Sequence, residues 1–439
     1  MMMVRNYIVF KYFFILLDIC GEGWTYFNGF CYFTNSSCAT WEAALSSCLS
    51  SNASLASITS QEENIYVQHK HGGETGWIGL QDRRSNGNFT WIDGTEVNFT
   101  YWAQIRTNKF SSDQNCVHTL GPSLGYLWKD VTCTACHTFT CKRGFPFISF
   151  SARFTNLGAT GRFGPTSIGS HYDGQSNKGQ VTLSSGIQIW RVPHTGSYRI
   201  EAVGASGGFD TEINTRIYRG RGAQIIGTFK LFKGELIKIL VGQEGGSINA
   251  KGGSAGGGGG SFVVRNHNTP LIIAGGGAGI ESATLRYSNA DASVYTNGNA
   301  NAGGTHWEGG RNGNGATAAD SGNSGGGGGG FYSSGRSSTN FGGSQGRGGE
   351  GGKGFLQGGA GGRSYVNSVP GGFGGGGGAY GSTTGGGAGG GGGYSGGASG
   401  DNDVDSSGGG GGSFNIGIDQ SNSCCYNDMG HGYVIVTSV

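Results

Sequence analysis

The sequence is poor in charge and proline and has few long apolar stretches. Only 13% of its 439 residues are charged, and the formal net charge is +2. The chain has no large excess of basic residues that could attract a polyanion, so we expect no nucleic-acid partner. The six prolines and the lack of a strict Gly-x-y register exclude a collagen triple helix. After residue 19 no stretch approaches the roughly 20 apolar residues of a membrane-spanning helix, so none is expected in the mature chain.

Enzyme motifs are missing as well. The sequence contains no His-Arg-Asp loop and no Asp-Phe-Gly motif, so residues for phosphoryl transfer are absent. The motif Gly-x-Gly-x-x-Gly recurs only within glycine tracts, and Gly352-Lys353-Gly354 lacks the Ser or Thr of a phosphate loop. The histidines show no metal-ligand spacing. We predict that the protein is not an enzyme and needs no cofactor.

The first 19 residues have the features of a signal peptide. Arg5 and Lys11 precede an apolar run at 12–17 that is too short to cross a bilayer. A membrane anchor is the alternative, which Lys11 and Asp18 disfavour because they interrupt and end the apolar stretch. We therefore expect a secreted, extracellular protein. Consistent with this route, N-glycosylation acceptors occur at Asn35, Asn52, Asn88 and Asn98.

The composition changes abruptly near Phe145. Eight of the ten cysteines lie between Cys20 and Cys141, and nearly all of the 95 glycines come later. This change predicts a signal peptide at 1–19, a first domain at 20–143, a linker at 144–150 and a glycine-rich domain at 151–439.

Local patterns place two helices in the first domain. Trp41, Ala44, Leu45 and Cys48 recur at the three- and four-residue spacing of a buried helical stripe. A second helix should follow Ser60, which with Glu63 would form a capping box in which each side chain bonds the other residue's backbone N–H.

Residues 20–141 resemble the C-type lectin domain family, and this resemblance implies an α+β fold. It is carried by an ordered series of aromatic and cysteine motifs: Gly23-Trp24-Thr25-Tyr26-Phe27, Cys31, Trp41-Glu42-Ala43-Ala44, Cys48, Trp77-Ile78-Gly79-Leu80, Phe89-Thr90-Trp91, Tyr101-Trp102, Cys116, Trp128-Lys129-Asp130, Cys133 and Cys141.

The resemblance also implies disulfides. It pairs Cys48 with Cys141 and Cys116 with Cys133, and it makes Cys20–Cys31 the bridge of an additional N-terminal hairpin. In this fold the first and last strands are antiparallel, so we predict a further bridge from Cys38 to Cys136. The alternative for Cys133-x-x-Cys136 is half of a zinc or redox site, but no second half is present.

Sugar-binding members of the family hold calcium through a loop that is altered in this chain. The corresponding positions are Arg106, Asn108, Gln114, Lys129 and Asp130. Calcium prefers six to eight oxygen ligands, and a cationic side chain about 4 Å away would oppose the ion by roughly 8 kcal/mol. We expect a glycan or protein ligand bound without calcium. Calcium-mediated sugar binding and a spacer that binds nothing are the alternatives.

The glycine-rich half also contains apolar segments typical of strands. Residues 187–193 and 196–205 alternate with period two around His194-Thr195, which predicts a β-hairpin. Further strands are expected at 223–229, 235–242, 261–264, 270–274 and 431–436. Because strands occur on both sides of the glycine tracts, the ends of this insertion should lie close together.

These segments resemble the extracellular glycine-rich domain of the anaplastic lymphoma kinase and leukocyte tyrosine kinase receptors. The match is carried by 187–193, 239–245, 270–277 and 430–432. It implies an all-β, jelly-roll-like sandwich with strands at about 151–245, 261–274 and 430–439. It also implies an insertion at about 245–412 whose glycine tracts are extended helices packed side by side. A flexible, low-complexity tract is the alternative.

Three functions are compatible with this organisation. The first is a secreted recognition protein that binds an extracellular glycan or protein. The second is a structural glycine-rich component of matrix or mucus, and the third is a soluble relative of a receptor kinase ectodomain that binds a protein ligand. Cys424-Cys425 forms either a bridge between neighbouring residues or a link to another chain.

Overall fold

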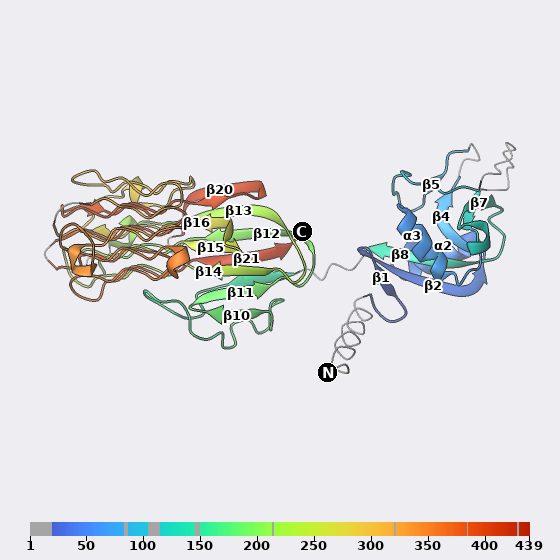
Figure 1. Ribbon diagram of the computed structural model, residues 1–439, viewed down its shortest axis with the longest axis horizontal. Helices are drawn as coiled ribbons and strands as arrows, with labels where there is room; N and C mark the ends of the chain where they lie inside the picture. Colours follow the sequence, from blue (N-terminus) through green and yellow to red (C-terminus); the bar gives the residue numbers. More distant parts are fainter. Residues whose placement is uncertain are drawn as a thin grey trace. The chain divides into compact units, whose positions relative to one another are not determined.

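The computed structural model describes residues 20–82, 87–103, 115–144, 150–212, 215–319, 322–383, 385–427 and 430–439 (Figure 1). The chain divides into two compact units, and the division falls between residues 148 and 149. None of the helices within the described ranges is long and apolar enough to cross a membrane. The expected signal peptide at 1–19 lies outside the described residues.

In its described residues, the first unit combines two α-helices with an eight-stranded sheet. The sheet order is β1-β2-β8-β4-β6-β7, with β3 paired to β8 and β5 to β4. Strand β8 runs antiparallel to β2 and parallel to β4. The elements are β1 (Thr25–Phe27), β2 (Phe30–Ala39), α2 (Trp41–Ser50), β3 (Ser54–Leu55), α3 (Gln61–Lys70), β4 (Gly76–Gln81), β5 (Thr90–Trp91), β6 (Cys116–Thr119), η1 (Pro122–Leu124), β7 (Trp128–Val131) and β8 (His137–Gly144).

Helix α2 follows its sequence pattern closely. The Thr40 side chain caps its first turn by accepting a hydrogen bond from the N–H of Ala43. Trp41, Ala44 and Cys48 are buried, and Leu45 is partly buried against the same core. The helix therefore covers the sheet with the predicted stripe.

Helix α3 has half of the expected capping box. The Ser60 hydroxyl accepts from the N–H of Glu63 at 3.2 Å, as predicted. The Glu63 carboxylate, however, accepts from the N–H and hydroxyl of Thr59, both at 2.8 Å. Its other oxygen is held by buried groups of the sheet, so the reciprocal bond of the box forms one residue earlier than expected.

The second unit contains two antiparallel sheets and a two-stranded ladder. One sheet has six strands in the order β10-β11-β14-β15-β16-β19, the other has five in the order β20-β13-β12-β21-β9, and β17 pairs with β18. The strands are β9 (Ser151–Phe154), β10 (Val181–Ser184), β11 (Ile187–Arg191), β12 (Gly196–Val203), β13 (Gly222–Leu231), β14 (Leu236–Leu240), β15 (Ser261–Arg265), β16 (Thr269–Ala274), β17 (Ile280–Glu281), β18 (Ser406–Ser407), β19 (Phe414–Asn415), β20 (Ile418–Asn427) and β21 (Tyr433–Ser438). Short 3-10 turns lie at Thr215–Tyr218, Ser288–Ala290, Thr339–Phe341 and Phe355–Gln357.

Both sheets of this unit contribute to one apolar core. Trp190 of β11 is fully buried and stacks on Phe150, with ring centroids 5.0 Å apart. Tyr198 of β12, in the other sheet, contacts the same indole edge-on at 5.7 Å. Aromatic burial of this kind is a major contribution to the free energy of folding.

The predicted hairpin between residues 187–193 and 196–205 is wrong. Strands β11 and β12 belong to different sheets, so the segment around His194-Thr195 carries the chain from one sheet to the other. Strand β11 instead pairs with β10 and β14, and the β10–β11 pair has Ser184 opposite Ile187. Ser185 and Gly186 connect them with φ values of 49° and 82°, as a two-residue type I′ hairpin requires.

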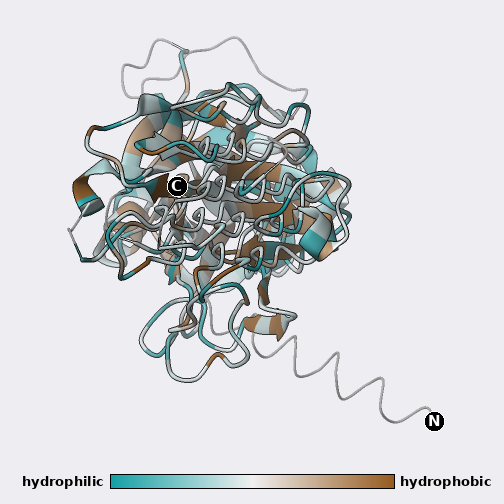
Figure 2. Cartoon of the chain, turned by 90° about the vertical axis from the view of Figure 1, so that its left-hand side faces the viewer, coloured by the Kyte–Doolittle hydropathy of each residue, from teal (hydrophilic) through white to brown (hydrophobic). Residues whose placement is uncertain are grey.

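The glycine tracts extend beyond one end of the sheets of this unit (Figure 1). Viewed along their length, they form small coils that pack side by side (Figure 2). Neighbouring tracts are joined by backbone hydrogen bonds, for example from the N–H of Gly257 to the carbonyl of Gly377 at 2.9 Å, and from Gly377 to Gly390 at 2.8 Å. A Cβ atom on Gly257 would lie 2.0 Å from the Gly390 oxygen. Glycine is therefore required at such positions because the backbones touch.

Candidate ligand-binding region

Disulfides brace the first unit, and a fifth lies in the second. All ten cysteines are described and none is free. The pairs in the first unit are Cys20–Cys31, Cys38–Cys136, Cys48–Cys141 and Cys116–Cys133. Cys424 is bonded to Cys425, the intrachain alternative for this pair.

A buried ion pair ties helix α3 to strands β2 and β8. The Lys142 ammonium lies 2.6 Å from a Glu63 oxygen, and the Tyr32 hydroxyl donates to the same oxygen at 2.5 Å. Burial alone would raise the pKa of Glu63, but the hydrogen bonds from Lys142 and Tyr32 hold this pKa below its usual range. Glu63 therefore stays ionised, and the network fixes the helix on the sheet.

Three histidines lie close together in this unit: His118 on β6, His137 on β8 and His71 directly after α3. The rings of His118 and His137 stack with centroids 4.4 Å apart. His71 is hydrogen-bonded to the hydroxyls of Thr119 and Thr140, at 3.1 and 2.9 Å. Burial and the neighbouring His137 lower the pKa of His71 to about 4 and that of His118 to about 3. Both rings are consequently neutral at physiological pH.

Aromatic rings support the start of β7. The Trp128 indole is fully buried and donates to the Asn64 side chain at 2.8 Å. Trp91, Phe99 and Trp102 contact it edge-on, at 5.6, 5.7 and 6.0 Å. This rigid base positions the two residues that follow Trp128.

Lys129 and Asp130 are the two described members of the predicted calcium loop. Arg106, Asn108 and Gln114 lie outside the described residues. On β7, Lys129 is exposed and Asp130 half-buried, and successive strand residues point to opposite faces. In the described parts of this unit, no three Asp, Glu, His or Cys ligand atoms come within 4.8 Å of one another. Asp130 and Lys129 alone therefore do not form a calcium site.

A surface hollow of about 350 Å³ lies on another part of this unit. Phe30, Asn52, Asp93 and Lys142 are among its lining residues, and the Lys142 ammonium lies 4.1 Å from the centre of the Phe30 ring. No sequence pattern predicted this hollow. Its residues come from separate segments, several of which are brought together by the pairing of β2, β3 and β8.

The predicted glycosylation acceptors are accessible to different degrees. Asn52, Asn88 and Asn98 are exposed, whereas Asn35 is half-buried on β2. Asn52 also lines the hollow, so a glycan attached there would cover part of it.

Comparison with known proteins assigns the first unit to a protein family. Residues 37–143 match the family model for the lectin C-type domain. The chain is 31% identical over 134 residues to human C-type lectin domain family 4 member K, covering 30% of this chain and 40% of that protein. It is 30% identical over 125 residues to the type-2 ice-structuring protein of Brachyopsis segaliensis, covering 28% of this chain and 73% of the relative. The crystal structure of the C-type carbohydrate-recognition domain of cow CD23 covers 28% of this chain and 95% of its own, with 30% identity and a TM-score of 0.27.

The chain thus spans less than half of the human relative's length but most of the length of the ice-structuring protein. The matched region holds three of the disulfides, the buried Trp77 strand and the capped helices described above. Through this domain, the chain belongs to the C-type lectin family.

Proposed function

We propose that this is a secreted extracellular protein whose lectin domain binds a glycan or protein ligand without calcium. The domain's relatives include lectins, which supports a recognition role. The observation that carries calcium independence is Lys129. The family's motif has an asparagine oxygen before the aspartate, and this chain presents an exposed ammonium group there.

Electrostatics supports this assignment. A lysine ammonium repels a divalent cation, yet it can donate hydrogen bonds to acceptor groups of a ligand. The buried Trp128 fixes the backbone from which Lys129 projects, so little conformational freedom of the main chain is lost on binding. Where the family's motif has a residue that coordinates calcium, Lys129 therefore contacts the bound glycan or protein directly.

The second unit is proposed as a folded glycine-rich sandwich related to the kinase-receptor ectodomains. Support comes from its two antiparallel sheets and from glycine tracts whose backbones are hydrogen-bonded to one another. Tracts ordered in this way favour a defined ligand-binding or spacing module over a mobile tether.

A glycan and protein array probed with the full chain tests the function. We expect the same ligands to bind in calcium and in a calcium chelator. Lys129→Asn, which restores the family's asparagine, should weaken this binding about tenfold, because one charge-assisted contact contributes roughly 1.5 kcal/mol or more. Lys233→Asn, at an exposed lysine of the second unit, is the matched control and should bind normally.

Binding that disappears in chelator would refute calcium independence. Equal binding by Lys129→Asn and the parent would show that Lys129 does not contact the ligand.

A further inference from the structure

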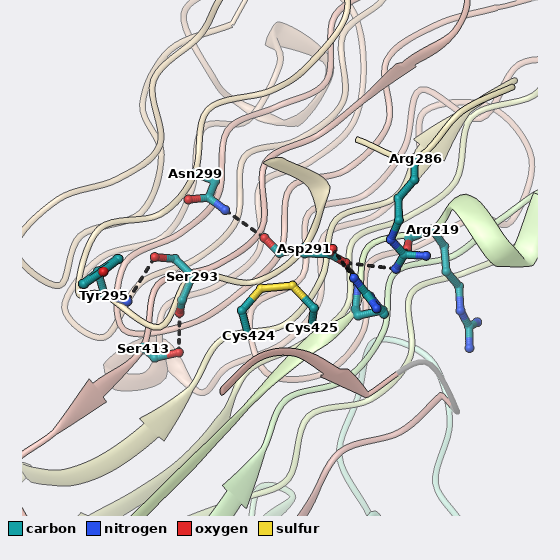
Figure 3. The surroundings of a disulfide bond; sticks show 10 residues. Arg219, Arg286, Asp291, Ser293, Tyr295, Asn299, Ser413, Cys424 and Cys425 are labelled. Atoms are coloured by element: carbon teal, nitrogen blue, oxygen red, sulfur yellow. Dashed lines mark hydrogen bonds and ion pairs between the residues drawn. A yellow bond between two sulfur atoms is a disulfide. The ribbon is translucent and has the colours of Figure 1, made fainter. Parts of the chain in front are cut away.

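The neighbouring cysteines Cys424 and Cys425 lie beside the Asp291 carboxylate in the second unit (Figure 3). We propose that reduction of this disulfide creates a site for a thiophilic divalent cation, Zn²⁺, with Cys424, Cys425 and Asp291 as ligands. The proposal rests on access to the sulfurs, on the conformation of their strand and on the position of Asp291.

The disulfide is accessible to a reductant. Strand β20 is the terminal strand of the five-stranded sheet, and among the described strands it pairs only with β13. Cys424 is exposed and Cys425 is half-buried. Thiol–disulfide exchange needs direct approach of the attacking group to a sulfur atom, and Cys424 permits it.

The disulfide also lies in a bulge of the ladder. Ser423 is paired with Gln224 and Asn427 with Gly222, so Cys424, Cys425 and Tyr426 oppose the single residue between Gly222 and Gln224. Cys425 has a φ of 66°, a left-handed conformation that costs a residue with a side chain about 1 kcal/mol. Opening the bond therefore breaks no ladder pair and lets Cys425 leave an unfavourable conformation.

Asp291 supplies a fixed oxygen ligand. Its carboxylate oxygen and the two sulfur atoms all lie within 4.8 Å of one another. Arg221 donates to this carboxylate from its backbone N–H and from Nη2, both at 2.8 Å, and Arg286 donates at 3.3 Å. Asn299 holds the backbone carbonyl of Asp291 at 2.8 Å. The carboxyl group is thus positioned before any metal arrives.

The charges around this carboxylate suit a dithiolate. Two thiolates and the Asp291 carboxylate would bring three negative charges together, and the two guanidinium groups offset two of them. Nearby cationic side chains also favour thiolate over thiol. The remaining negative charge attracts a divalent cation, and the two soft sulfur ligands favour Zn²⁺ over Ca²⁺ or Mg²⁺.

The chemistry has two balanced steps. A dithiol reductant transfers two electrons and two protons to the sulfurs, the S–S bond breaks, and the reductant becomes a disulfide. Zn²⁺ then displaces both thiol protons and forms two Zn–S bonds, while Asp291 donates an oxygen and water completes the shell. The disulfide itself has no anionic sulfur, so the oxidised protein offers no such site.

Zinc titration of the full chain tests the proposal. The background carries Cys38→Ser and Cys136→Ser, because that exposed pair would also be reduced. After treatment with a dithiol and its removal under nitrogen, Zn²⁺ is titrated against a chromophoric chelator. We expect one zinc per reduced chain and none per oxidised chain. Adding Cys424→Ser and Cys425→Ser should abolish binding, and adding Asp291→Asn should weaken it about tenfold or more.

Alkylation and peptide mass mapping of the wild-type protein provide a check that does not depend on the background. Zn²⁺ should protect Cys424 and Cys425 from alkylation after reduction. The proposal fails if zinc affinity is the same with and without these two cysteines, or if zinc leaves their alkylation unchanged. Unaltered affinity in Asp291→Asn would overturn the three-ligand site.

Discussion

At the scale of single residues, the lectin domain depends on side chains whose ionisation the fold controls. Lys142 and Tyr32 keep Glu63 ionised, whereas burial keeps His71 and His118 neutral. Both effects come from groups on different strands or helices. Their protonation is therefore a property of the folded domain.

Acid should destabilise the lectin domain through these histidines. In the unfolded chain a histidine has a pKa near 6.5, but folding lowers the pKa of His118 to about 3 and that of His71 to about 4. Below pH 6.5 these histidines bind protons in the unfolded state but not in the folded state. The free energy of unfolding therefore falls as the pH drops toward the pKa values of the folded state. The loss is roughly 2 kcal/mol per histidine at pH 5.

Urea unfolding at pH 7.5 and pH 5, followed by tryptophan fluorescence, measures this loss. His118→Phe removes one of the titrating rings and should make the decline smaller. An identical decline in parent and variant would show that His118 is not the group responsible.

At the scale of secondary-structure elements, the glycine tracts replace side-chain packing with backbone contact. Each tract satisfies its N–H and C=O groups through its neighbours, which offsets the large entropy cost of ordering glycine. A methyl group added within this array has no room to move away, because the atoms it meets are themselves backbone.

Gly257→Ala should therefore destabilise the second unit by roughly 3 kcal/mol, the upper range for overpacking. Gly196→Ala is the matched control, because its Cβ would meet only a ring carbon of Tyr198 at 3.9 Å. Differential scanning calorimetry compares the two. If both variants melt like the parent, the tracts are not packed as described.

Sequence patterns predicted the elements better than their partners. The stripe on α2 and the Ser60 cap follow from local spacing and were found. The hairpin assigned around His194-Thr195 was wrong, because period-two alternation identifies a strand without identifying the sheet it joins. The turn at Ser185-Gly186 was the overlooked signal. Lys142 and the hollow beside it depend on contacts between residues more than 80 positions apart, for which a single sequence gives no signal.

At the scale of the whole molecule, the two units are stabilised by different means. Four disulfides cross-link the first unit, and two of them join residues 93 and 98 positions apart. The one disulfide of the second unit joins adjacent residues and closes no loop of chain. A cross-link over about 100 residues stabilises a fold by roughly 4–5 kcal/mol.

A strong reductant should thus affect one unit far more than the other. In calorimetry we expect the transition of the lectin domain to move to much lower temperature or vanish, while that of the glycine-rich unit shifts little. Near-ultraviolet circular dichroism assigns the transitions, because six of the eight tryptophans lie in the lectin domain and two, Trp190 and Trp307, lie in the glycine-rich unit. A comparable loss in both units would mean that the glycine-rich unit depends on the disulfides of the lectin domain.

Strand β21 has a consequence for how the protein is made. It lies between β12 and β9, with Val436 opposite both Ile200 and Ala152, although the glycine tracts separate these partners by more than 230 residues of sequence. During translation β12 and β9 leave the ribosome long before β21 does, so this sheet cannot close while the tracts are still being synthesised. A premature stop codon anywhere in the tracts would leave an open sheet edge, and such a product is a natural substrate for chaperones and quality-control proteases.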